Sequence, residues 1–145
     1  MSEANKAVVR RLFDECLNRH DLNLYPELYS DVVYRAPAIG ELCGEEHREF
    51  LASLFVAFPD ARWNLEDQIA EGEKVVTRWT FIGTHRETFL GIPPTEKQLV
   101  SGGICIDRIV DGRIVEEWEE WDTLGMMQQL GVVPVEKGVG DFVAP

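Results

Sequence analysis

Two strand-like runs joined by Asp111-Gly112 constrain the fold of this chain more than any other feature. Residues 98–110 and 113–122 are rich in β-branched and aromatic side chains, and Asp-Gly between two such runs indicates a tight β-hairpin. If Val110 pairs with Arg113, strict alternation puts five side chains of the second strand on one face: Ile114, Glu116, Trp118, Glu120 and Asp122. A row that is apolar at its start and acidic at its end, beside a tryptophan, is typical of the wall of a pocket with a polar bottom.

Helical periodicity dominates the first half of the chain. Residues 4–19 and 45–58 each carry an apolar stripe at helical spacing, and a shorter helical piece is expected at 24–28. Strands are expected at 32–36, 61–71 and 74–85, with an irregular loop over 86–97 and a short helical turn at 124–130. Helices followed by an antiparallel sheet predict an α+β fold, with a cavity between the two layers.

Composition excludes several classes of protein. The 145 residues carry a net charge of −12, which opposes binding to nucleic acid or to an anionic membrane surface. The longest apolar runs are too short to cross a bilayer, and the first residues lack the apolar core of a secretion signal, so we expect a cytoplasmic protein. Three widely spaced cysteines predict reduced thiols, and three scattered histidines give no metal-binding motif.

Several local motifs, in order, resemble the SnoaL-like polyketide (ester) cyclase family of the nuclear-transport-factor-2-like superfamily. The resemblance spans roughly residues 5–131. It rests on these stretches: Asn5–Arg11, Ala57–Asp60, Ile69–Val76, Arg78–Thr80, Gly83–His85, Phe89–Thr95, and Ile114–Trp118 with Trp121-Asp122. It implies a cone-shaped, curved antiparallel sheet with the N-terminal helices on its concave face. We expect one domain over 1–131 and a C-terminal tail over 132–145.

The resemblance also implies a chemistry. Characterised members close a ring of an aromatic polyketide by intramolecular aldol condensation, without a metal or cofactor, and an acidic residue acts as general acid/base. The position similar to that residue here is Asp122. Many relatives carry a histidine where this chain has Tyr34-Arg35-Ala36-Pro37. The superfamily also includes isomerases, dehydratases, epoxide hydrolases and non-catalytic proteins, so fold does not settle function.

Asp122 is therefore the leading candidate for catalysis, since indoles and other carboxylates nearby would raise its pKa toward a useful range. The alternative is that Asp122 is the N-cap of the following helical turn. His85, at the end of a strand, is a second catalytic candidate that could polarise a carbonyl or hold Asp122. As an ordinary residue it would simply be hydrogen-bonded at a strand end.

Five further residues are candidates for substrate binding. Trp118, Trp79 and Tyr34 would form apolar walls for a flat ligand, although core packing explains Trp79 equally well. Glu120 belongs to the acidic row of the last strand, in which Glu116 also lies. Arg78 alternates onto the face opposite Trp79, so only one of these two can face the pocket.

The sequence thus predicts a cofactor-free enzyme that acts on a small hydrophobic or polycyclic carbonyl compound. The alternatives are a non-catalytic domain that binds a hydrophobic ligand, or an isomerase, dehydratase or epoxide hydrolase. An epoxide hydrolase would need Arg78 or Arg108 beside Asp122 and Asp107. The opposite hairpin face, assigned to Ile104, Ile106, Val115 and Trp121, predicts a homodimer formed through the outer sheet face.

Overall fold

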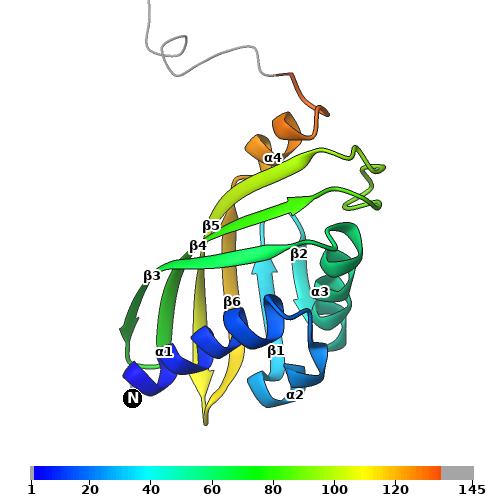
Figure 1. Cartoon of the computed structure of the whole chain (residues 1–145). Coiled ribbons are helices and arrows are strands. Elements are labelled where there is room, and N and C mark those ends of the chain that lie inside the picture. The colour runs from blue at the N-terminus through cyan, green and yellow to red at the C-terminus, as the bar shows by residue number, and fades with distance from the viewer. Residues whose placement is uncertain (1, 135–145) are drawn as a thin grey trace, which may run out of the picture.

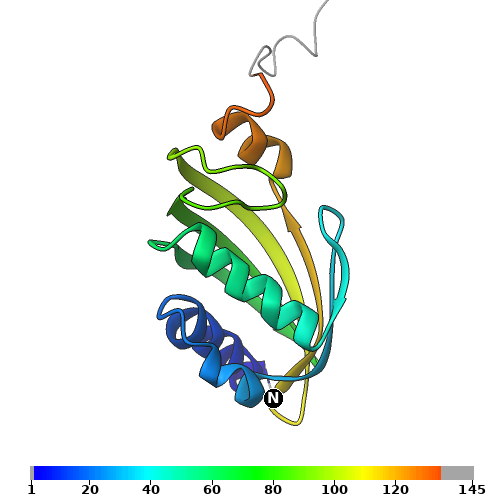
Figure 2. The same cartoon turned by 90° about the vertical axis from the view of Figure 1, so that its right-hand side faces the viewer.

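The computed structural model describes residues 2–134 and contains one curved sheet with helices on its concave face (Figures 1 and 2). Most helical segments precede or follow the first two strands: α1 (Ser2–Arg11), which continues as the π-helical turn η1 (Leu12–Leu17), the 3-10 turn η2 (Leu22–Leu24), α2 (Tyr25–Leu28) and α3 (Glu45–Ala57). The last helix, α4 (Thr123–Gln129), follows the final strand. The strands are β1 (Tyr29–Ala36), β2 (Gly40–Cys43), β3 (Arg62–Glu71), β4 (Lys74–Thr84), β5 (Gln98–Val110) and β6 (Arg113–Trp121). The predicted α+β class is confirmed. The part of the expected tail from residue 135 on lies outside the described residues.

The six strands are ordered β2-β1-β6-β5-β4-β3. All neighbouring pairs are antiparallel except β1 and β6, which run parallel, so the sheet is mixed. The predicted hairpin is present: Val110 pairs with Arg113, and Asp111 and Gly112 both adopt positive φ, as a tight two-residue turn requires.

The core lies between the concave face and the helices. Helix α1 packs on β3 and β4, while α3 packs on β1 and β2. Buried apolar side chains fill the space between the layers, among them Val9, Phe13, Leu28, Val32 and Phe58. Figure 2 shows α1 and α3 on the same side of the sheet, with α4 at one end of it.

A β-bulge in β6 changes which side chains reach this core. Ile109 pairs with Ile114 but Arg108 pairs with Glu116, so Val115 is an extra residue in β6. Beyond it the alternation is reversed. The predicted row is therefore wrong: Ile114 is buried in the core, whereas Glu116 and Trp118 lie on the outer face.

Candidate active site

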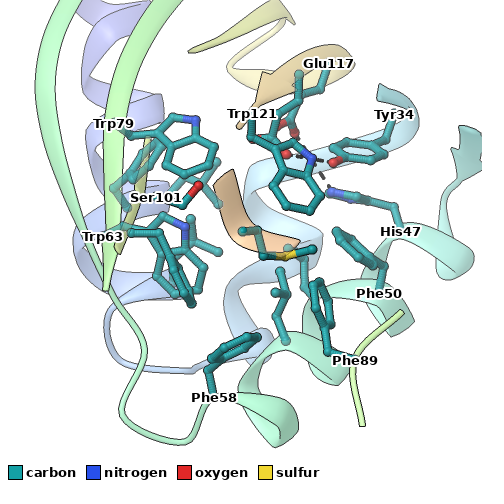
Figure 3. A pocket seen from close by; sticks show the side chains of 18 of the residues that line it. Tyr34, His47, Phe50, Phe58, Trp63, Trp79, Phe89, Ser101, Glu117 and Trp121 are labelled. Atoms are coloured by element: carbon teal, nitrogen blue, oxygen red, sulfur yellow. Dashed lines mark hydrogen bonds and ion pairs between the residues drawn. The ribbon is translucent and has the colours of Figure 1, made fainter. Parts of the chain in front are cut away.

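A pocket opens between the concave sheet face and the helices, and most of its wall is apolar. Three tryptophans line it, Trp63, Trp79 and Trp121. Four polar side chains of the wall lie together, Tyr34, His47, Glu117 and Glu119, whereas Ser101 lies across the pocket beside Trp79, as Figure 3 shows for the labelled residues. The free volume is about 70 Å³, enough for a few water molecules or a small ring. A fused polycyclic ligand would require side chains of the wall to move.

Three buried acidic side chains cluster beside the pocket, and two of them, Glu117 and Glu119, line it. Asp107 on β5 and Glu117 on β6 are directly paired across the strands, and Glu119 lies two residues further along β6. Burial is the largest cause that raises the pKa of each carboxyl: Asp107 to about 8, Glu119 to about 7, and Glu117 well above its usual range. Negative charge on neighbouring members raises the pKa of Asp107 and Glu117 further. The cluster therefore retains protons at neutral pH.

Tyr34 holds Glu119 in place. The Tyr34 hydroxyl donates a hydrogen bond of 2.6 Å to Glu119 Oε1, which partly offsets the rise in the pKa of that carboxyl. The Tyr34 ring stacks on the imidazole of His47, with 4.7 Å between ring centroids. Glu119 is thus the acid of the cluster that has both a fixed orientation and a pKa near neutrality, as general acid/base catalysis requires.

His47 on α3 completes this side of the pocket. Its Nε2 lies 3.9 Å from Glu117 Oε1, and its Nδ1 lies 2.9 Å from the hydroxyl of Tyr25. Burial lowers the pKa of His47 to about 4, so the ring is neutral at pH 7 and contacts Glu117 without forming an ion pair. The backbone carbonyl of Gly44 accepts a hydrogen bond from the Tyr25 hydroxyl, which holds this hydroxyl next to His47.

One group within the described residues has the geometry to hold a metal ion. Ligand atoms of Cys105, Asp107 and Glu117 lie within 4.8 Å of one another, and all three side chains are buried. Burial raises the pKa of the thiol as well as those of the two carboxyls. A cation would have to displace protons from all three, because metals bind thiolates and carboxylates.

The predicted site residues divide between the two faces of the sheet. Tyr34 and Trp79 line the pocket. Trp118 lies on the outer face between Arg35 and Lys74, whose charged groups stand 5.5 and 5.4 Å from its ring. Arg78 and Glu120 are exposed on the same outer face, so the expectation that Trp118, Glu120 and Arg78 line the ligand pocket is not met there.

Asp122 lies outside the pocket and caps a helix. Its side chain is exposed and accepts a hydrogen bond of 2.9 Å from the backbone N–H of Gly125, at the start of α4. The same residue borders a shallow hollow on the outer surface with Arg78, Gly102, Gly103 and Glu120. The geometry of Asp122 is therefore that of the N-cap alternative.

His85 is fully buried but is absent from the pocket wall. Its Nδ1 accepts a hydrogen bond from the backbone N–H of Thr95, and its own backbone N–H donates to Lys97. Its ring stacks on Phe58 at 5.4 Å. These contacts fasten both ends of the 86–97 loop, which places Phe89 in the pocket wall.

The comparisons with known proteins identify the family. The family model for SnoaL-like polyketide cyclases matches residues 7–130. The chain belongs to the SnoaL-like polyketide cyclase family. No curated protein matched it.

Several solved structures superpose on most of the chain. AclR from Streptomyces galilaeus, a candidate hydroxylase, is 26% identical over 92% of this chain and 100% of its own, with a TM-score of 0.82. IdmH from Streptomyces antibioticus, a candidate polyketide cyclase, is 29% identical over 88% and 98%, with a TM-score of 0.77. TsrD from Streptomyces laurentii is 28% identical over 90% and 97%, with a TM-score of 0.80.

Proposed function

We propose that this SnoaL-like protein catalyses proton transfer next to a carbonyl group of a hydrophobic small molecule, as ring closure of a polyketide by aldol condensation requires. The observation that supports this most is Glu119, held at 2.6 Å by Tyr34 in the wall of an apolar pocket, with a pKa of about 7. Such a carboxyl exists in both protonation states at neutral pH and can serve as base and as acid.

The proposed cycle needs only a carboxyl and its proton. Ionised Glu119 removes a proton from the carbon next to a carbonyl, which leaves an enolate on the ligand and a neutral Glu119. The enolate carbon attacks a second carbonyl of the same molecule, and the resulting alkoxide takes the proton back from Glu119. No metal or cofactor enters this scheme. Burial raises the pKa of Glu119 to about 7 and so keeps its neutral form available in this cycle.

Two alternative hypotheses compete with this proposal. The family resemblance favours Asp122 as the acid/base, and AclR's assignment as a candidate hydroxylase shows that relatives differ in the reaction suggested for them. A non-catalytic domain would use the same pocket only to hold a ligand. Each predicts a different response to substitution of the two acids.

Exchange of the α-hydrogens of 2-tetralone in D₂O, followed by NMR, tests the proposal. Glu119→Gln keeps the hydrogen bond from Tyr34 but removes the base, so we expect exchange to slow by about 100-fold or more. Asp122→Asn preserves the helix cap and should leave the rate unchanged. The reverse pattern would assign the role to Asp122, and a wild-type rate no faster than buffer would favour the non-catalytic domain.

We propose further that two copies associate through their outer sheet faces, in a reducing compartment such as the cytoplasm. Two apolar side chains on that face, Ile104 and Ile69, are 48% and 64% exposed, which supports the interface. The three cysteines are unpaired, which is consistent with a reducing compartment. Trp121, expected on this face, instead lines the pocket. Within the described residues, no helix is long and apolar enough to span a membrane. Sedimentation should show a dimer at micromolar concentration that Ile104→Glu dissociates; a wild-type monomer would refute the interface.

A further inference from the structure

Two polar groups in the pocket wall take no part in the chemistry proposed above. The hydroxyl of Ser101 and the indole N–H of Trp79 are buried, and neither has a hydrogen-bond partner among the described residues. Both side chains are only 6% exposed, and both line the pocket. Buried polar groups in folded proteins are nearly always hydrogen-bonded, so a pair of unpartnered donors in one pocket indicates a bound group that satisfies them.

The sheet brings these two donors to the same part of the wall. Ser101 on β5 pairs with Phe81 on β4, and Trp79 pairs with Gly103, one inward-facing position away along each strand. Gly103 leaves room for the indole, because a Cβ there would collide with the Trp79 ring. Figure 3 shows Ser101 and Trp79 on the side of the pocket away from Tyr34 and His47.

The distance from these two donors to Glu119 determines how far apart the polar groups of a ligand must lie. Glu119 pairs with Cys105, four residues from Ser101 along β5, which corresponds to about 13 Å between backbone positions. The wall between them consists of the glycine at 103 with the indoles of Trp79 and Trp121 beside it. An indole N–H can only donate, and a hydroxyl can donate, so both groups suit an acceptor oxygen.

We propose that Ser101 and Trp79 form a subsite for a hydrogen-bond acceptor on the ligand, at the end opposite the reacting carbonyl. The ligand class is then a flat, hydrophobic molecule with oxygen at both ends: a carbonyl that reaches Glu119, and a ketone, ether or phenol oxygen that reaches Ser101 and Trp79. This subsite rests on the proposed function for the identity of the reacting end. The subsite itself contributes to binding the ligand and to orienting it in the pocket.

A matched pair of ligands isolates the subsite. In 6-methoxy-2-tetralone the ether oxygen lies across the ring system from the ketone, and 6-ethyl-2-tetralone replaces that oxygen with a methylene group of similar shape. Isothermal titration should show that the wild type binds the methoxy compound about threefold to tenfold more tightly, as one neutral hydrogen bond provides. Ser101→Ala and Trp79→Phe should each reduce this preference, and the double variant should bring it to near unity.

Two controls separate this inference from the proposed function. Ser53→Ala removes an exposed hydroxyl on α3 and should keep the preference. Glu119→Gln should also keep it, even if that variant loses exchange, because the ether oxygen does not contact Glu119. Equal affinities of the wild type for the two compounds, binding of neither, or an unchanged preference in both Ser101→Ala and Trp79→Phe would each overturn the subsite. Failure of Glu119→Gln to slow exchange would instead overturn the proposed function alone.

Discussion

The buried acids should make this protein less stable as the pH rises, the reverse of the usual behaviour of carboxylates. The folded-state pKa of Glu119 is about 7 and that of Asp107 is about 8, both above the values of exposed carboxyls. At these two carboxyls the folded state therefore binds more protons than the unfolded state between about pH 4.5 and pH 8. Stability contributed by these protonated groups is fully present below that window and is lost as the pH rises through it.

Glu119→Gln isolates the part that Glu119 contributes. A rise from 4.5 to about 7 is about 2.5 pH units, which at about 1.4 kcal/mol per unit corresponds to roughly 3 kcal/mol. The variant should equal the wild type in unfolding free energy at pH 4.5 and exceed it at pH 8 by up to about 3 kcal/mol. Urea denaturation at constant ionic strength, monitored by circular dichroism, measures both profiles.

The exposed neighbour Glu120 supplies the matched control. Glu120→Gln changes the same charge on the outer face, so its profile should run parallel to that of the wild type. Profiles of Glu119→Gln and wild type that stay parallel between pH 5 and pH 8 would refute the argument, because Glu119 would then titrate as an exposed acid. So would a wild-type stability that rises between pH 6.5 and pH 8, above the range in which neutral, buried His47 makes the opposite contribution.

Substitutions at three further positions have defined outcomes. Gly103→Ala should destabilise by about 1–3 kcal/mol and weaken ligand binding, because its Cβ would displace the Trp79 indole and approach a backbone oxygen to 2.8 Å; titration calorimetry and urea denaturation check both. Asp122→Ala should cost about 1 kcal/mol and Asp122→Asn much less, since asparagine also caps helices, as thermal unfolding would show. Glu116→Gln breaks outer-face ion pairs with Arg35 and Arg108. It should lower the melting temperature in low salt and not in high salt.

Local signals in the sequence predicted most elements of the fold. The Asp111-Gly112 turn and the apolar stripe of residues 45–58 depend on neighbours within a few positions, so they are readable from one chain. The parallel pairing of β1 with β6 is different. It joins segments about 80 residues apart, and no local pattern distinguishes a parallel partner from an antiparallel one.

The candidate site was harder to predict because one extra residue in β6, Val115, reverses which side chains face the pocket. Strict alternation placed Glu116 and Glu120 on the pocket face and so left Glu117 and Glu119 on the opposite face. The bulge at Val115 instead turns Glu117 and Glu119 toward the core. Nothing in the sequence of that strand marks the bulge. His47, by contrast, could have been found, since it shares the helical stripe of Leu51 and Leu54 and lies on the side of α3 that faces the pocket.

The buried polar groups that lack hydrogen-bond partners lower the stability of the fold, and core packing does not require them. A buried donor without a partner costs about 1–3 kcal/mol, a large share of the stability of an ordinary domain. Ser101 could be alanine without loss of any hydrogen bond among the described residues, and that replacement should raise the melting temperature. Groups that destabilise the empty protein are expected where binding requires them. An increase in stability together with a smaller methoxy preference in Ser101→Ala would show that the hydroxyl serves the ligand and not the fold.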